Sequence, residues 1–573
     1  WHPDIIEFII SKMQNPRILR FLIEHSNDDQ IKQLAREKLK FTPLTETEKA
    51  MYQGIVNFKN IPGQGGFSDQ VIQEAEEKLK TGGTYSVHNP DFLTGANISV
   101  CLTKEFMEAV ENDEEYELRF PDVENYTEEQ MNIYNEEWHK VGDVREWEKR
   151  GFPVRVYRKI RAKELWNLIN ICATYSAEPG IFFIDNANDK TNASAYGQKV
   201  VATNPCGEQP LAPYSVCNLG AINLANMVDK DRKQVDFDKL KRTVQVAVRM
   251  MDNVIDATPY FLEENRRQAL GERRIGLGVM GLADMLIYCE KVYGGEDGNK
   301  LVDKVFKTIA TIAYRASIEL AKEKGSFPFL FTGNVSDTLR NAEEFTNTGF
   351  MRQMPKDIRE DIRRYGIRNS HLLTVAPTGS TGTMVGVSTG LEPYFSFKYY
   401  RSGRLGKFIE VNADIVQEYL DANPDNDPNN LPEWFVTAMD LTPEAHADVQ
   451  CVIQRWIDSS ISKTVNAPRG YTVEQVQRVY ERLYKGGAKG GTIYVDGSRD
   501  AQVLSLEKDE SETKTNEKTP PVLIETINEL TSTSMSIGSE IGDTCPICRK
   551  GEIIEAGGCN TCNSCGAQLK CGL

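Results

Sequence analysis

The sequence predicts an α/β fold, with one large body and a small cysteine-rich module near the C-terminus. Long segments of helical periodicity alternate with short apolar runs up to about residue 504, as expected for helices interleaved with strands. Residues 505–521 contain almost no apolar side chains and end in a proline pair, and six of the twelve cysteines follow between Cys545 and Cys571. We therefore expect a body at 1–504, a flexible linker at 505–541 and a tail module at 542–573.

The strongest helix and strand candidates can be placed individually. Apolar residues recur at helical spacing over 299–325, where Gly325 is a suitable stop. The first residues, WHPDIIEFII, predict an amphipathic helix. Because the chain begins at Trp1 rather than at a methionine and enters this helix at once, we expect it to be the downstream part of a longer protein. Short apolar runs bounded by Gly, Pro, Asn or Asp predict strands at 97–103, 181–185, 372–377 and 491–497.

Composition excludes several classes of partner. The chain has 573 residues, a net charge of −16 and a pI near 5.1, whereas nucleic acids and acidic membranes require a basic surface. No run approaches the roughly 18 uninterrupted apolar residues of a membrane span, and the first residues lack the basic segment of a signal peptide. We expect a cytoplasmic protein that binds neither membrane nor nucleic acid.

The tail cysteines have the spacing of a zinc site. Cys545 and Cys548 form one C-x2-C, and Cys559, Cys562 and Cys565 form two overlapping ones. Two such turns can present four thiolates to tetrahedral Zn²⁺, and the metal would stabilise a module too small to fold on its core alone. The alternative is a set of free redox-active thiols.

Four zinc ligands leave two tail cysteines over. If Cys545, Cys548, Cys562 and Cys565 bind the metal, Cys559 and Cys571 remain. If Cys559 and Cys562 are the second pair, Cys565 and Cys571 remain. Either remaining pair could exchange with a disulfide elsewhere.

The stretch NPCGEQPLAPYSVCNLG carries the most informative cysteines of the body. Asn204, Cys206 and Glu208 alternate, and Cys217 follows. None of the six histidines lies near Cys206 in sequence, and the carboxylate of Glu208 disfavours a thiolate, which argues against a cysteine hydrolase. The pattern is compatible with a thiol that loses a hydrogen atom, with Glu208 as a base toward the substrate and Cys217 as half of a redox pair.

The remaining body cysteines are expected to be structural. Cys172 and Cys289 lie on apolar helical patterns, which predicts burial, and Cys101 on a strand is also expected to be a buried thiol.

The glycine-rich stretch LLTVAPTGSTGTMVGVSTG could bring backbone N–H groups close to a phosphate. Its spacing matches neither a Walker loop nor a dinucleotide fingerprint, so a plain turn is an equal alternative.

Taken together, these motifs resemble the catalytic subunit of ribonucleotide reductases, most closely the adenosylcobalamin-dependent class. The Asn-Pro-Cys-Gly-Glu run resembles the finger-loop motif of that family, and SVCNLGAINL resembles the segment that carries one of its redox cysteines. Residues 11–95 match least and are expected to be an insertion. The resemblance extends over nearly the whole chain, through WHPDIIEFI, NISVCLTKEFMEAVENDEEYEL, AEPGIFFID, RRIGLGVMGLADML, LTVAPTGST, SKTVNAP and KGGTIYVDGSR.

The resemblance implies a role for each site residue. Cys206 would be the thiyl radical that takes the 3′ hydrogen of the ribose, and Glu208 the base for the 3′ hydroxyl. Asn204 would hydrogen-bond the substrate, and Cys217 would be one of two cysteines that supply electrons as the 2′ hydroxyl leaves as water. The substrate phosphates would be cradled by Pro377, Thr378, Gly379, Ser380 and Thr381.

The resemblance also implies a fold, cofactors and partners. The fold is a ten-stranded α/β barrel of two half-barrels with the finger loop at its centre, and adenosylcobalamin is the radical source. The substrates would be ribonucleotides, with diphosphates favoured over triphosphates, and the products deoxyribonucleotides for DNA synthesis. A thioredoxin-like or dithiol reductant, a nucleotide effector bound through the upstream region and a homodimer are the expected partners.

Two features of the family are expected to lie upstream of Trp1: the strand that carries the redox partner of Cys217, and the effector region. Cys101 does not match the position of that partner. One alternative is a reductase whose radical comes from a separate metal-containing subunit. The catalytic subunits of such reductases carry a tyrosine pair near the C-terminus, whereas the last tyrosine here is Tyr494. A non-catalytic binding homologue is disfavoured because all four loop residues are present.

Overall fold

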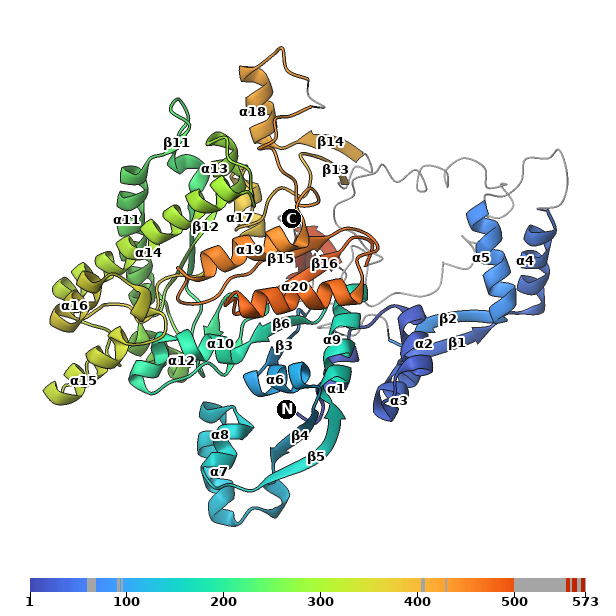
Figure 1. The fold of residues 1–573 in the computed structure, drawn as a ribbon, viewed down its shortest axis with the longest axis horizontal. Helices are drawn as coiled ribbons and strands as arrows, with labels where there is room; N and C mark the ends of the chain where they lie inside the picture. Colours follow the sequence, from blue (N-terminus) through green and yellow to red (C-terminus); the bar gives the residue numbers. More distant parts are fainter. Residues whose placement is uncertain are drawn as a thin grey trace. The chain divides into compact units, whose positions relative to one another are not determined.

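The computed structural model of the chain describes residues 1–58, 69–89, 93, 96–402, 408–427, 430–498, 553–556, 559–563 and 568–571. The chain divides into two compact units. The first comprises Trp1–Tyr399 and Glu410–Val503, and the second comprises Tyr400–Ile409 and Leu504–Leu573. The first unit contains the mixed helices and strands that the sequence predicts (Figure 1).

The secondary-structure elements are numbered in chain order. No helix within the described ranges is long and apolar enough to cross a membrane. The helices are α1 (Ile5–Ile10), α2 (Pro16–His25), α3 (Asp29–Lys38), α4 (Glu46–Phe58), α5 (Asp69–Thr81), α6 (Lys104–Asn112), α7 (Glu128–Val141), α8 (Val144–Lys149), α9 (Ala162–Ser176), α10 (Ile184–Lys190), α11 (Phe237–Ala257), α12 (Glu263–Glu272), α13 (Leu282–Tyr288), α14 (Glu296–Lys324), α15 (Val335–Thr346), α16 (Lys356–Tyr365), α17 (Gly379–Met384), α18 (Asp414–Ala422), α19 (Pro443–Gln454) and α20 (Val473–Lys485). The strands are β1 (Leu39–Pro43), β2 (Gly83–Val87), β3 (Ser99–Leu102), β4 (Glu115–Pro121), β5 (Val154–Arg161), β6 (Gly180–Phe183), β7 (Ala202–Thr203), β8 (Pro210–Leu211), β9 (Leu219–Asn223), β10 (Val228–Asp229), β11 (Gln234–Val235), β12 (Gly276–Met280), β13 (Lys398–Ser402), β14 (Phe408–Asn412), β15 (Thr464–Ala467), β16 (Gly490–Val495), β17 (Ile553–Ala556), β18 (Cys559–Cys562) and β19 (Gln568–Cys571).

One continuous run of strands forms the centre of the first unit. Its order is β9, β12, the segment 372–375, the segment 461–467 that contains β15, then β16, β6 and β3. From β9 to β16 each neighbour is parallel to the next, joined by parallel bridges such as Leu277 to Leu373 and Val375 to Ile461. The direction reverses once, because β16 is antiparallel to β6, and β6 is parallel to β3. The run is thus five parallel strands followed by two of the opposite direction.

This run is an open sheet within the described residues. No pairing joins β9 to β3, so the closed ten-stranded barrel that the family resemblance implies is not present in this part of the chain. The α/β architecture is confirmed, whereas the predicted closure of the barrel is not observed among the described strands.

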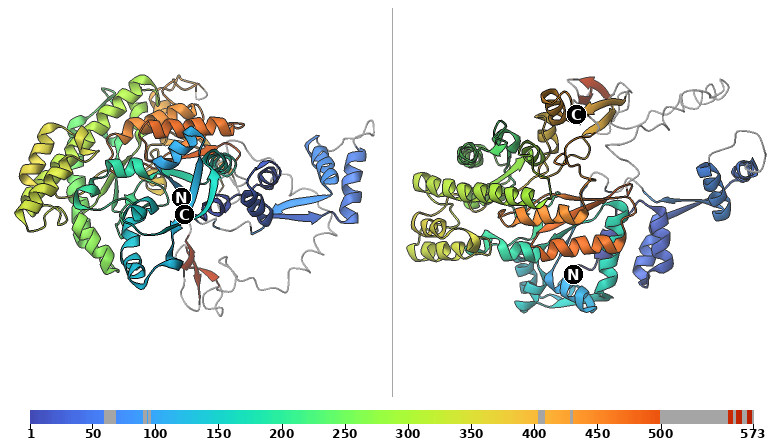
Figure 2. Two further views of the ribbon diagram at one scale, coloured as in Figure 1. Left: turned by 60° about the horizontal axis from the view of Figure 1, so that its bottom comes forward. Right: turned by 45° about the horizontal axis from the view of Figure 1, so that its top comes forward.

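Helices cover the outside of the strands in a matching order. α11, α14, α19, α20 and α9 pack each against the next, so the helix order follows the strand order. Figures 1 and 2 show this layer running from the green α11 and α14 through the orange α19 and α20 to the teal α9. The buried apolar side chains of α11 and α14 form one core, and those of α9 and α20 form a second.

The predicted elements agree well with the observed ones. The predicted strand at 97–103 contains β3, those at 181–185 and 491–497 overlap β6 and β16, and α1 confirms the amphipathic N-terminal helix. α14 ends at Lys324, and Gly325 caps it with a φ of 84°, a conformation in which glycine alone is unstrained. The predicted strand at 372–377 joins the sheet through bridges rather than through a long ladder.

The second unit contains a small antiparallel sheet. β18 pairs with β17 on one side and with β19 on the other, and Cys559 lies opposite Cys571. Of the expected zinc ligands, Cys545, Cys548 and Cys565 lie outside the described residues, as does the expected linker at 505–541. The zinc ribbon and the domain boundaries therefore remain predictions.

Candidate active site

The finger loop, residues 204–209, is the tip of a short antiparallel hairpin formed by β7 and β8. Asn204 closes this tip twice: its backbone N–H donates to the Gln209 carbonyl at 3.3 Å, and its Oδ1 accepts the Gln209 N–H at 2.9 Å. Gly207 has a φ of 80°, which favours glycine. Asn204 and Gly207 therefore impose the shape of the loop, a requirement that the residue pattern alone does not reveal.

The loop is anchored to the strands through the backbone of Glu208. The Glu208 carbonyl accepts a hydrogen bond from Thr374 Oγ1 at 2.6 Å and another from the Ser460 N–H at 2.9 Å. The neighbouring Gln209 packs against Gly276 of β12, where a Cβ atom would lie 2.5 Å from Gln209 Nε2. Three adjacent strands of the sheet thus hold the loop in place.

Cys206 and Glu208 are only two residues apart but lie in opposite environments. Cys206 is exposed at the tip, whereas Glu208 is buried, with an exposure of 2%. Burial and the nearby Glu208 carboxylate raise the pKa of the Cys206 thiol. The raised pKa favours the protonated thiol of Cys206 near neutral pH.

Glu208 has the environment of a proton acceptor. Burial raises the pKa of its carboxyl group, and hydrogen bonding to Asn204 partly offsets the shift. Its Oε2 has no hydrogen-bond partner among the described residues. A buried carboxylate oxygen without a partner is costly unless a ligand or water binds it, so Oε2 can accept a proton from a bound hydroxyl.

Cys217 lies just before β9 and is exposed. Burial by its neighbours and the charge of Glu208 raise the pKa of its thiol. Glu208 thus acts electrostatically on both cysteines, so the three side chains lie in one neighbourhood.

The glycine-rich loop follows the strand segment 372–375 directly. Pro377, Gly379, Ser380 and Thr381 are exposed, while Thr378 is half-buried and its Oγ1 accepts the Gly390 N–H at 2.7 Å. A Cβ atom at Gly379 would meet nothing within 4 Å. The loop therefore has open space in front of it, which suits its predicted role in phosphate binding.

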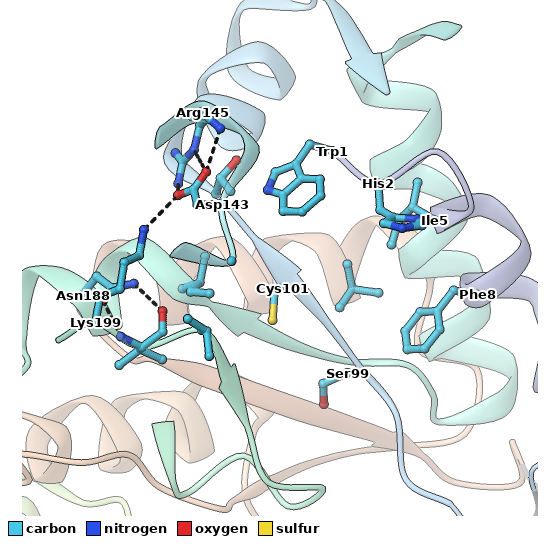
Figure 3. A pocket seen from close by; sticks show the side chains of 16 residues that line it. Trp1, His2, Ile5, Phe8, Ser99, Cys101, Asp143, Arg145, Asn188 and Lys199 are labelled. Carbon is cyan, nitrogen blue, oxygen red and sulfur yellow. Dashed lines mark hydrogen bonds and ion pairs between the residues drawn. The ribbon is translucent and has the colours of Figure 1, made fainter. Parts of the chain in front are cut away.

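Two of the three body cysteines expected to be buried are buried. Cys172 and Cys289 lie inside the cores, but the prediction for Cys101 is wrong, because this residue is exposed. It lies on β3, the last strand of the open sheet, and points into a pocket that Trp1 and Phe8 line with it (Figure 3). The atoms around this pocket desolvate the thiol and raise its pKa to about 11.

Some residues of the site carry no recognisable sequence signal. Thr374 and Ser460 anchor the finger loop from more than 150 residues away in sequence, and buried Arg274 donates to the Pro210 carbonyl at 3.3 Å. Arg274 belongs to the quoted run RRIGLGVMGLADML, so its sequence context was visible although its function was not. None of the described residues forms a cluster of ligands suited to a metal ion.

The fold and the site define an α/β protein whose open, mostly parallel sheet holds a cysteine-bearing hairpin against its strands. The family described as "Ribonucleotide reductase, barrel domain" matches residues 1–494. The chain belongs to this family.

Relatives of two kinds are similar to the chain. It is 31% identical, over 79% of its length, to the vitamin B12-dependent ribonucleoside-diphosphate reductase of Thermoplasma acidophilum, and 32% identical, over 74%, to the enzyme of the same name from Mycobacterium tuberculosis. It is also 29% identical, over 65%, to the ribonucleoside-diphosphate reductase subunit alpha of Chlamydia pneumoniae, of which it covers 38%. The chain spans only 54% and 55% of the two B12-dependent relatives.

Proposed function

We propose that this chain is the catalytic core of a vitamin B12-dependent ribonucleoside-diphosphate reductase, which converts ribonucleotides to 2′-deoxyribonucleotides by thiyl-radical chemistry. The observation that carries the proposal is the finger loop, whose tip exposes the Cys206 thiol while three strands anchor its buried end. A protonated thiol is suited to losing a hydrogen atom and poorly suited to nucleophilic attack.

Each side chain has a defined task in this reaction. Cys206, once a thiyl radical, takes the 3′ hydrogen atom of the ribose, and Glu208 Oε2 accepts the proton of the 3′ hydroxyl. The 2′ hydroxyl leaves as water, and two electrons come from Cys217 and a partner cysteine, which become a disulfide. Asn204 hydrogen-bonds the substrate, while Pro377, Thr378, Gly379, Ser380 and Thr381 surround its phosphates.

Adenosylcobalamin is the cofactor that this proposal requires, and when bound it supplies a carbon-centred radical that can oxidise a thiol. The exposed position of Cys206 fits an external radical source, since its sulfur is accessible at the tip of the hairpin. The names of the relatives from Thermoplasma acidophilum and Mycobacterium tuberculosis support cobalamin over a separate radical subunit.

The open sheet requires completion before it can shield a radical. We expect three further strands, supplied by polypeptide that this chain does not contain, to join β9 and β3 and close a ten-stranded barrel. An apolar stripe supports this: Val246, Met250 and Val254 of α11 are 68%, 58% and 43% exposed. They lie on the opposite flank of α11 from Arg249, which pairs with α14.

The tail module supplies electrons in this proposal. Zn²⁺ bound by Cys545, Cys548, Cys562 and Cys565 would fold the module, and Cys559 and Cys571 would re-reduce the active-site disulfide. The register that places Cys559 opposite Cys571 supports a dithiol pair. A thioredoxin-like or dithiol reductant, a nucleotide effector and a second copy of the chain complete the expected partners.

The test is deoxynucleotide formation by the full gene product with adenosylcobalamin and a dithiol. Cys206→Ser should reduce the rate of product formation by more than about a thousandfold, because serine cannot form the radical under these conditions. Cys101→Ser, which removes an exposed thiol outside the finger loop, should retain the rate. Equal activity in the two variants would refute the proposal.

A further inference from the structure

The buried side chain of Arg274 contacts the finger-loop hairpin that carries Cys206 and also acts on Cys217. Arg274 lies two residues before Gly276, which pairs with Leu219 in the parallel register of β12 and β9. Cys217 lies two residues before Leu219. Parallel strands keep the same spacing, so the register places Arg274 beside Cys217.

The side chain of Arg274 is buried, with an exposure of 2%, and has few partners. Nη1 donates to the carbonyl of Pro210, on the return strand of the finger-loop hairpin, at 3.3 Å. Nε lies 3.4 Å from Glu272 Oε1, whose side chain is 0% exposed. Neither Nε nor Nη2 has a hydrogen-bond acceptor among the described residues. A buried guanidinium with donors left over is costly and calls for a functional reason.

The charges that act on Cys217 come from three side chains. Burial raises the pKa of the thiol most, and Glu208 and Glu272 raise it further. Among the described residues, Arg274 is the one cation that acts on this thiol, and it lowers the pKa of the thiol. Arg274 and Glu272 therefore oppose each other at Cys217.

We propose that Arg274 is the positioning residue of the redox cysteine, holding the return strand of the finger loop and favouring the thiolate of Cys217, with Glu272 as the counter-charge. The roles of the cysteines rest on the proposed function. When a dithiol reduces the Cys217 disulfide, a reductant thiolate attacks the partner sulfur, the S–S bond breaks and Cys217 leaves as a thiolate. The second reductant thiol then closes the reductant disulfide, so two electrons and two protons reach the protein. A cation beside the leaving sulfur speeds this step.

The test measures the alkylation rate of Cys217 by iodoacetamide across pH 7 to 10, with each thiol followed by mass spectrometry. Arg274→Met should slow alkylation at pH 8 by about three- to tenfold, and Glu272→Gln should speed it by a similar factor. Arg274→Lys should retain most of the wild-type rate. The pH midpoint of Cys206 alkylation should not change in any variant, because Arg274 does not contribute to its pKa.

Opposite shifts in the two variants distinguish an electrostatic role from a structural one, since a general loosening would move both rates in the same direction. A matched control is Arg482→Met, which removes an exposed arginine that pairs with Asp448 on the surface helices. If Arg274→Met does not fold, the expected increase in the Cys217 alkylation rate of Glu272→Gln still tests the proposal. Unchanged rates, or shifts of the same sign, would overturn it. Alkylation needs neither cofactor nor substrate, so this result is independent of reductase activity.

Discussion

The two cysteine-bearing regions of the chain differ in what holds their thiols in place. In the finger loop, hydrogen bonds from the Thr374 hydroxyl and the Ser460 N–H fix the Glu208 carbonyl, and the hairpin of β7 and β8 presents Cys206. In the tail module the cysteines lie close together in a short sequence with little apolar content, so a metal is expected to stabilise them. The finger loop therefore obtains its geometry from a large fold, whereas the tail module is expected to obtain its geometry from a bound metal.

Within the finger loop, replacing Glu208 should have a large effect on catalysis and little effect on stability. Glu208→Gln should lower the rate of deoxynucleotide formation by about a hundredfold or more, because the amide cannot accept the substrate proton. In the wild type the rate should fall as the pH drops through the raised pKa of Glu208. Rate measurements between pH 5 and 9 on the full gene product check both expectations.

The same substitution should not destabilise the protein. Because the pKa of Glu208 is raised in the folded state, the folded state holds more protons than the unfolded state between the two pKa values. The stability contributed by this group is therefore present below its unfolded pKa and is lost as the pH rises through the folded pKa. Because glutamine does not ionise, Glu208→Gln should not lose this stability as the pH rises. Urea unfolding at pH 8 should show that the variant is at least as stable as the wild type. Marked destabilisation of Glu208→Gln would contradict the assignment of Glu208 as a buried carboxylate retained for function.

The second effect concerns the tail module. The purified chain should contain about one zinc ion, and replacing Cys545 and Cys548 with serine should abolish zinc binding, measured by elemental analysis. Removing the metal with a chelator should increase the alkylation rate of the tail thiols but leave that of Cys206 unchanged. A changed Cys206 alkylation rate on chelation would show that the metal also supports the finger loop. The absence of zinc from the purified chain would favour free redox thiols in the tail.

The smallest effect tests how the strands support the finger loop. A Cβ atom at Gly278 of β12 would lie 2.4 Å from the Thr374 carbonyl oxygen, whereas one at Gly379 would meet nothing within 4 Å. Gly278→Ala should therefore cost about 1–3 kcal/mol of unfolding free energy, and Gly379→Ala should change it by less than about 0.5 kcal/mol. Urea unfolding of both variants measures this difference, and equal costs would argue against close contact between these strands.

The sequence reveals local features of this molecule better than long-range ones. The stop of α14 at Gly325 and the strands β3, β6 and β16 follow from nearby residues, and so does the alternation of Asn204, Cys206 and Glu208. The exposure of Cys101 could not be predicted, because an apolar strand does not show whether a neighbour covers it. The anchoring of the loop by Thr374 and Ser460 depends on strand order, which only the tertiary structure supplies.

The most direct test of the account is hydrogen exchange between adenosylcobalamin and solvent, measured as tritium release from cofactor labelled at the 5′ carbon of its deoxyadenosyl group. The label exchanges only if a solvent-exchangeable thiol returns hydrogen to the cofactor. If Cys206 carries the radical, we expect tritium release by the full gene product and by Cys217→Ser, and loss of release in Cys206→Ser. Release that persists in Cys206→Ser would contradict the central claim that the thiol of the finger loop carries the radical.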